Sequence, residues 1–176
     1  MHADDLGLLI LRLVVGLTFA VHGAQKAFGW WSGPGWRGWQ NAIGRMGFRP
    51  VEVFAILSVG AELVGGLLLA IGLLTPLAAA ILAAQSVVII LKVHASNGFW
   101  NKANGSEFPL LIGVAAVVIG LTGPGAIGLD PASGLRPSDT VRLAFVIAGL
   151  AAGVLTIALP AEVPSSESRG EATGPR

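Results

Sequence analysis

The sequence contains no cysteine and no tyrosine, and only 12% of its 176 residues are charged. The lack of cysteine excludes thiol nucleophiles, disulfides, cysteine-ligated iron–sulfur clusters and cysteine zinc sites. The lack of tyrosine excludes a tyrosyl radical or a phenolic acid. Soluble domains carry about 25% charged residues, so this chain has too little polar surface to cover itself in water. Its net charge of +1 gives no electrostatic reason to expect a nucleic-acid partner.

Long apolar segments make up most of the chain. A spanning helix needs about 20 mainly apolar residues, because the hydrocarbon core of a bilayer is roughly 30 Å thick. Five segments reach or approach this length: 6–28, 53–74, 77–93, 108–121 and 141–159. The connection between the second and third segments is too short to leave the membrane surface, so these two form an antiparallel hairpin. We therefore predict an all-α, polytopic membrane helical bundle embedded in the lipid bilayer.

The chain divides into three expected parts. Residues 1–130 form a four-helix membrane domain, and residues 131–160 add a C-terminal transmembrane helix. Residues 161–176 are rich in Ser, Glu, Gly and Pro and lack the apolar residues needed to fold, so we expect a disordered tail. The acidic first residues do not form the positive start of a secretory signal, and we expect the first apolar segment to be retained as a span.

Small residues four positions apart let membrane helices approach closely. Two such pairs lie in predicted spans, Ala61-x-x-x-Gly65 and Gly149-x-x-x-Gly153. Each is a candidate helix contact.

Two polar loops carry all five tryptophans, four of them in residues 29–50 and Trp100 in residues 95–106. Tryptophan favours the headgroup region of a membrane, so we interpret the first loop as an interfacial anchor rather than a ring-stacking ligand site. Five alternating spans place both loops on the same face. That face carries most of the Lys and Arg residues, so the positive-inside rule predicts that it is cytoplasmic and that the N-terminus lies outside.

Ionisable residues inside spanning helices are costly and usually mark a function. Arg12 lies well inside the first segment, and Glu62 is the only carboxylate deep in a predicted span. An Arg12–Glu62 ion pair is therefore expected. Two interpretations stay open: the pair holds two helices together, or it lines a polar cavity that binds a quinone-like headgroup.

Two histidines raise the question of a haem or a metal. His22 and His94 both fall near the same boundary of neighbouring spans, which would suit bis-histidine haem ligation, and Glu107 could add a third metal ligand. Two histidines in a membrane bundle are nevertheless a weak signal, and no local His/Glu spacing of a known metal motif occurs. We favour neither haem nor metal, and no cofactor is assigned.

Several ordered motifs resemble the DoxX family of small bacterial membrane proteins. They are Leu11-Arg12-Leu13, His22-Gly23-Ala24-Gln25-Lys26, Ala61-Glu62-Leu63-Val64-Gly65-Gly66, and His94-x-x-Asn97-Gly98-Phe99 followed by Gly105-x-Glu107-x-Pro109. The resemblance implies a four-helix bundle in the cell membrane of a bacterium and a subunit linked to quinone redox chemistry. The fifth apolar segment departs from the usual four, which leaves the C-terminal side and the partner surface open.

The first functional hypothesis is a DoxX-like integral membrane subunit that binds a quinone or similar small molecule and assists a redox-enzyme or respiratory-complex partner. Electrons would come from that partner, so we expect an accessory subunit rather than a stand-alone enzyme; a homo-oligomer is compatible with the sequence. No catalytic residue is assigned. The expected cavity has Arg12 and Glu62 at its base and His22, Lys26 and His94 at its mouth. Glu107 lies on a covering loop. Gln25 and Asn97 complete the ligand-binding candidates. The second hypothesis is a non-catalytic scaffold or assembly factor whose buried polar residues are structural.

Overall fold

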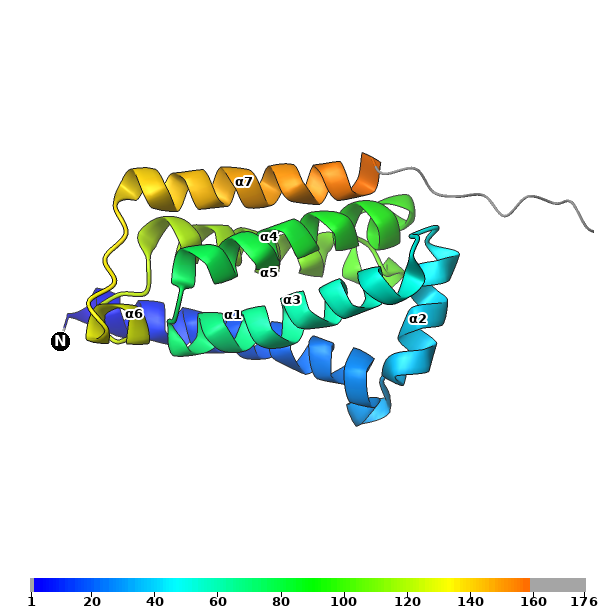
Figure 1. The fold of residues 1–176 in the computed structure, drawn as a ribbon, viewed down its shortest axis with the longest axis horizontal. Helices are drawn as coiled ribbons and strands as arrows, with labels where there is room; N and C mark the ends of the chain where they lie inside the picture. Colours follow the sequence, from blue (N-terminus) through cyan, green and yellow to red (C-terminus); the bar gives the residue numbers. More distant parts are fainter. Residues whose placement is uncertain (1, 159–176) are drawn as a thin grey trace, which may run out of the picture.

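Five long helices run lengthwise through the protein. The computed structural model describes residues 2–158. The long helices are α1 (Ala3–Phe28), α3 (Val51–Ile71), α4 (Thr75–Ile89), α5 (Glu107–Thr122) and α7 (Asp139–Ala158). They lie side by side, and consecutive ones run in opposite directions (Figure 1). The prediction of an all-α polytopic bundle with a fifth C-terminal spanning helix is confirmed. The expected disordered tail lies outside the described residues.

The helix lengths suit a bilayer in four of the five cases. α1, α3, α7 and the extended α4 are long and apolar enough to span one. α4 gains its length from a π-helical turn (Ile90–His94) and a 3-10 turn (Ala95–Asn97). α5 has 16 residues and is therefore only about 24 Å long. Pro109 sits in its first turn, where a missing N–H removes no intrahelical bond.

Glycines let α1 and α3 approach backbone to backbone. A Cβ atom on Gly16 would come within 2.5 Å of the Gly66 carbonyl oxygen, and one on Gly23 within 2.6 Å of the Leu63 nitrogen. The facing residues therefore run in opposite directions along the two helices. This antiparallel register decides which polar side chains of α1 and α3 can meet.

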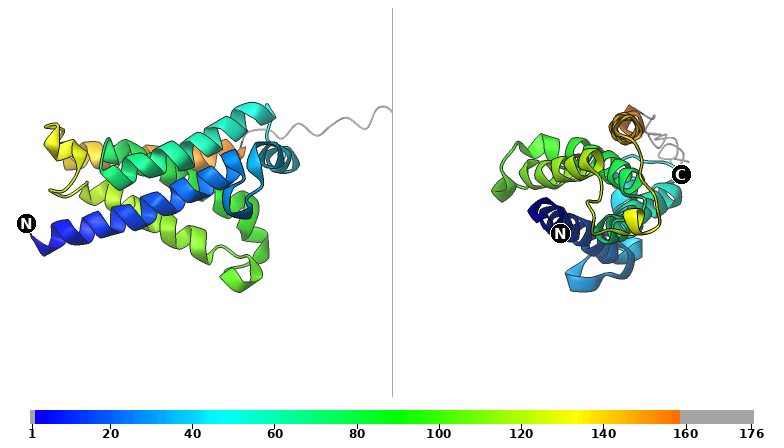
Figure 2. Two further views of the ribbon diagram at one scale, coloured as in Figure 1. Left: turned by 90° about the horizontal axis from the view of Figure 1, so that it is seen from below. Right: turned by 90° about the vertical axis from the view of Figure 1, so that its left-hand side faces the viewer.

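Small residues also join α7 to α4. Gly149 packs on the backbone of Ala80, and a Cβ atom on Gly153 would come within 2.7 Å of the Ala84 carbonyl oxygen. The predicted contact at Gly149-x-x-x-Gly153 is confirmed. α7 lies at the edge of the bundle (Figure 2), and besides these two glycines only Val146 is buried among its described residues. Most of α7 therefore faces outward.

Replacing Gly149 with leucine is expected to loosen α7 from α4, because the added side chain would collide with the Ala80 backbone. Overpacking costs about 1–3 kcal/mol, so the midpoint of thermal unfolding in detergent should fall by several degrees. Ala151→Leu enlarges a side chain on the exposed side of the same helix and serves as the control. Equal midpoints for the two variants would contradict the observed packing.

The first tryptophan-rich loop contains a helix, α2 (Gly35–Arg45). The sequence did not predict this helix, because its glycines have a low helix propensity. Trp36, Trp39 and Ile43 recur at helical spacing and pack with Ala55 at the start of α3. The expected interfacial loop is thus partly a helix, which lies across the end of the bundle (Figure 2). We call this end, with α2 and residues 95–106, the tryptophan end. The opposite end, with the α3–α4 turn, is the hairpin end.

Candidate functional site

Four polar side chains form a network that crosses from α1 through α3 to α4. Lys26 donates a hydrogen bond to Glu62 and forms an ion pair with it. The amide nitrogen of Gln85 lies 3.1 Å from the same carboxylate oxygen and 2.9 Å from the Ser58 hydroxyl oxygen. The Glu62 side chain is 1% exposed and that of Lys26 13%, so the ion pair is shielded from water. Attraction between the charges is stronger in such a low-dielectric environment than at a surface.

The expected Arg12–Glu62 ion pair is wrong, and the register of α1 against α3 explains why. Gly23 faces Leu63, so Glu62 lies beside the last turns of α1, within reach of Lys26. Arg12 is 11 residues earlier than Gly23, which is about 16 Å along the helix axis. The two ionisable groups that the sequence places deepest therefore belong to separate sites.

Arg12 instead binds the backbone of the loop after α5 at the hairpin end. Its guanidinium donates to the Ile127 carbonyl, and its charged neighbour is Asp130 in the short helix α6 (Leu129–Ala132). The Asp130 carboxylate accepts hydrogen bonds from the backbone nitrogens of Leu74 at 2.6 Å and Thr75 at 2.8 Å. It therefore satisfies free N–H groups at the start of α4.

The residues after α4 that resemble the family motifs stabilise their own loop. The Asn104 carbonyl oxygen lies 2.7 Å from His94 Nδ1 and 3.2 Å from the side-chain nitrogen of Asn97. The Glu107 carboxylate accepts a hydrogen bond of 2.9 Å from the Asn101 backbone nitrogen. Together with the contact of Asn97 to the Val93 carbonyl at 3.4 Å, these hydrogen bonds of His94, Asn97 and Glu107 all lie within residues 93–107.

The two remaining candidates on α1 lie near Lys26 but outside the network. His22 is half-buried, with its ring centroid 6.1 Å from that of Phe108 on α5. Gln25 accepts a backbone hydrogen bond from Gly29 at 3.1 Å and packs closely against Gly33. The single predicted cluster is therefore divided: Arg12 lies at the hairpin end, Lys26 and Glu62 meet, and the other candidates lie around them at the tryptophan end.

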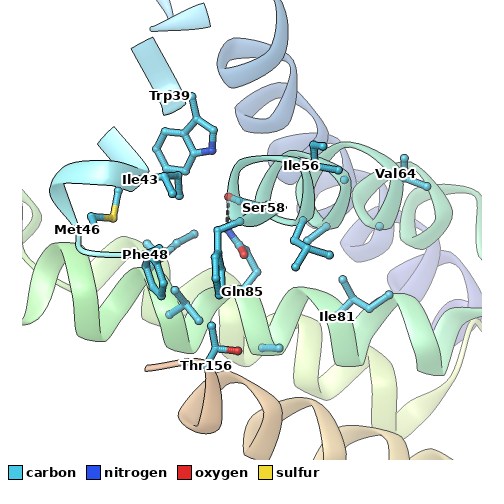
Figure 3. A pocket seen from close by; sticks show the side chains of 18 of the residues that line it. Trp39, Ile43, Met46, Phe48, Ile56, Ser58, Val64, Ile81, Gln85 and Thr156 are labelled. Atoms are coloured by element: carbon cyan, nitrogen blue, oxygen red, sulfur yellow. Dashed lines mark hydrogen bonds between the residues drawn. The ribbon is translucent and has the colours of Figure 1, made fainter. Parts of the chain in front are cut away.

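An apolar cavity of about 500 Å³ opens between α3 and α4. α2 covers it at the tryptophan end, and Thr156 of α7 borders it (Figure 3). Ala61 and Gly65, expected to form a helix contact, line this cavity, and Gly65 also faces the Leu82 and Ile81 side chains of α4. Among the described residues that line it, none is charged. The predicted polar cavity is thus an apolar one that has a few polar groups on its wall.

These polar groups lie near the covered end. Ser58 and Gln85 of the network and the indole of Trp39 all line the cavity (Figure 3). The Lys26 nitrogen is 4.1 Å from the centroid of the Trp39 ring, a cation–π contact that joins the network to α2. The Trp39 indole nitrogen is buried, and within residues 2–158 it has no hydrogen-bond partner.

Sequence reasoning did not single out Ser58 or Asp130 and placed Gln85 only as one polar residue of the third span. A serine in an apolar helix is common, and Asp130 sits in a glycine-rich connection with no motif around it. Helical spacing offered the one usable signal: Ser58 and Glu62 are four residues apart and so share a face of α3.

Metal ligands do not gather in the part of the chain that the structure describes. Within residues 2–158, no three His, Asp or Glu side chains are placed to hold one ion.

Comparison with known proteins gives the family. The sequence model of the DoxX family matches residues 7–95, which include the network and most of the cavity. A Bacillus subtilis (strain 168) protein named "Putative oxidoreductase CatD" is 29% identical over 127 residues, covering 72% of this chain and 87% of the relative. An uncharacterized membrane protein of Mycobacterium tuberculosis is 31% identical over 142 residues, covering 74% of this chain and 83% of the relative. No solved structure matches the chain. The chain belongs to the DoxX family.

Proposed function

We propose that this membrane protein binds a quinone or a similar neutral, amphipathic small molecule in the α3–α4 cavity and assists a redox partner. The observation that carries the proposal is the meeting of the buried network with the cavity at Ser58 and Gln85. Ligand sites are typically apolar cavities of about 300–1,000 Å³ with a few convergent polar groups, and the α3–α4 cavity has this character.

The polar groups at the covered end fit a quinone headgroup. The Ser58 hydroxyl and the Trp39 N–H are donors with no acceptor within residues 2–158, and each suits a carbonyl oxygen of the ligand. The Gln85 carbonyl is an acceptor for a ligand hydroxyl. A bound quinone supplies two-electron, two-proton chemistry. Behind the wall, the Glu62–Lys26 pair holds an exchangeable proton one hydrogen bond away from Gln85.

An accessory role and an orientation in the membrane complete the proposal. One relative is named as an oxidoreductase, and the cysteine-free chain cannot itself ligate an iron–sulfur cluster through thiolates, so we assign electron supply to a partner. We also infer that the tryptophan end faces the cytoplasm, since it carries most of the Lys and Arg residues.

The test is a binding titration with a water-soluble quinone, in which quenching of tryptophan fluorescence measures the bound fraction. Ser58→Ala and Gln85→Leu should each weaken binding about five-fold, because a lost hydrogen bond is worth about 1 kcal/mol. Ser86→Ala is the matched control: that hydroxyl is buried next to Gln85 in sequence, donates to the Leu82 carbonyl at 2.9 Å and does not line the cavity. Absence of binding, or equal affinities for all three variants, would overturn the proposal.

A scaffold role is the second candidate, and one observation favours it. Four of the eight candidate residues make their observed polar contacts to nearby loop backbone: Arg12, His94, Asn97 and Glu107. A scaffold would support its partner without a ligand. Wild-type levels of partner activity in the Ser58→Ala and Gln85→Leu variants, with no measurable quinone binding, are the result that this role predicts.

A further inference from the structure

The α3–α4 cavity is elongated along the helices that form it. Its lining residues on α3 recur at helical spacing from Phe54 to Leu68, a rise of about 21 Å. We call this elongated space along α3 the chain track. The polar pair, Ser58 and Gln85, lies near one end of it. From Ser58 to Leu68 the remaining track extends about 15 Å toward the hairpin end. A quinone headgroup bound at Ser58 and Gln85 would leave most of that length unfilled.

The long part of the track has only apolar walls. Ala61, Gly65 and Leu68 line it from α3, and Ile81 and Ala84 from α4. Because this part carries neither charge nor a hydrogen-bonding side chain, its chemistry matches an uncharged hydrocarbon chain. Small residues on both helices leave the space that such a chain would occupy.

The cavity is covered toward water and borders lipid along its side. At the tryptophan end Ile43 and Phe48 are buried, 3% and 6% exposed, and pack over the cavity. On α3, by contrast, the lining residues Leu57 and Val64 are 59% and 55% exposed on the outside of a spanning helix. A ligand that arrives from the bilayer meets no aqueous barrier, whereas one from water must pass the α2 cover.

We infer that the cavity takes a ligand with one long hydrocarbon chain, which enters sideways from the bilayer and lies along α3 between Ser58 and Leu68. The inference rests on the proposed function, because the ring at Ser58 and Gln85 sets which end of the ligand points toward α2. The ligand is a membrane-borne, chain-bearing molecule rather than a soluble ring compound. The headgroup lies near the tryptophan end and the chain runs past the middle of α3 toward the hairpin end.

Gly65→Leu tests the chain track without disturbing the backbone. A Cβ atom at Gly65 would meet the Leu82 and Ile81 side chains at 3.5–3.6 Å, an ordinary contact, and because Gly65 and Ile81 line the cavity, a larger side chain there reduces the space of the track. Gly7→Leu makes the same change on α1, where a Cβ atom meets nothing within 4 Å, away from the cavity.

The experiment titrates wild type and both variants, in nanodiscs, with two quinones that share a ring: one without a chain and one with several prenyl units. In wild type, the chain-bearing quinone should bind at least ten-fold more tightly. Gly65→Leu should remove that difference while changing the affinity for the short quinone less than two-fold, and Gly7→Leu should change neither.

The outcomes separate the two claims. If both quinones bind wild type equally, or if Gly65→Leu weakens both to the same extent, the chain track is wrong and the headgroup site stands. If neither quinone binds wild type, the proposed function fails as well.

Discussion

Replacing Arg12 with methionine is expected to lower the free energy of unfolding by about 2–3 kcal/mol, the cost of leaving buried polar and charged groups without their neighbour. Arg12 is 1% exposed, and its loss leaves the Ile127 carbonyl without its donor and the buried Asp130 without its charged neighbour. The measurement is unfolding by SDS in dodecyl maltoside micelles. Arg37→Met, at an exposed arginine of α2, is the control and should change stability little.

A double-mutant cycle separates this contact from a general loss of packing. Asp130→Asn removes the charge but keeps an oxygen that can accept from Leu74 or Thr75. In that background, Arg12→Met should cost at least 1 kcal/mol less, because no unpaired carboxylate remains. An Arg12→Met variant as stable as wild type would contradict the assignment, and so would a cost that Asp130→Asn does not reduce.

The Glu62→Ala variant should lose about 3 kcal/mol of stability, because the buried Lys26 ammonium loses its partner and the Gln85 amide loses one of its two acceptors. Glu62→Gln keeps a partner for Gln85 and should lose less. Quinone affinity should also fall in Glu62→Ala, by no more than the about five-fold expected for Gln85→Leu, since Gln85 loses one of the two hydrogen bonds that orient it toward the cavity.

Two comparisons make the Glu62 prediction specific. Glu52→Ala alters an exposed carboxylate in the first turn of α3 and should affect neither stability nor binding. Lys26→Met should recover part of the stability lost in the Glu62→Ala background, since it removes the unpaired charge. If Lys26→Met and Glu62→Ala instead destabilise additively, the two side chains do not form the pair described here.

The spans were predictable because the bilayer imposes a length and a polarity on them. Runs of about 20 apolar residues and the short connection between segments 53–74 and 77–93 define the helices with little help from tertiary structure. The buried residues of α1 also have a regular helical spacing: Arg12, Gly16, Phe19 and Gly23 share one face, and all four are buried.

The pairing of the buried charges was not predictable, because the register between two helices depends on contacts far apart in the sequence. Glu62 and Arg12 were paired as the two deepest ionisable groups. The close approach of Gly16 to Gly66 fixes a register that brings Lys26 to Glu62 instead. Asp130 was missed for a similar reason: its partners, Leu74 and Thr75, lie more than 50 residues earlier.

The register also changes how the family motifs are understood. His22-Gly23-Ala24-Gln25-Lys26 supplies both a close helix contact, through Gly23, and the cation of the network. The Ala61 to Gly66 motif supplies the carboxylate on one side of α3 and part of the cavity lining on the other. α3 thus joins the ion pair that it forms with α1 to the apolar cavity that it forms with α4.

The most direct test of this account is native mass spectrometry of the full chain released from its own membrane in mild detergent. We predict a stoichiometric, uncharged adduct with the mass of a chain-bearing quinone, whose occupancy is unchanged in Ser86→Ala and reduced in Gln85→Leu. Wild-type protein that carries no such adduct, or an adduct retained equally in Gln85→Leu, would contradict the assignment of the α3–α4 cavity as a quinone site.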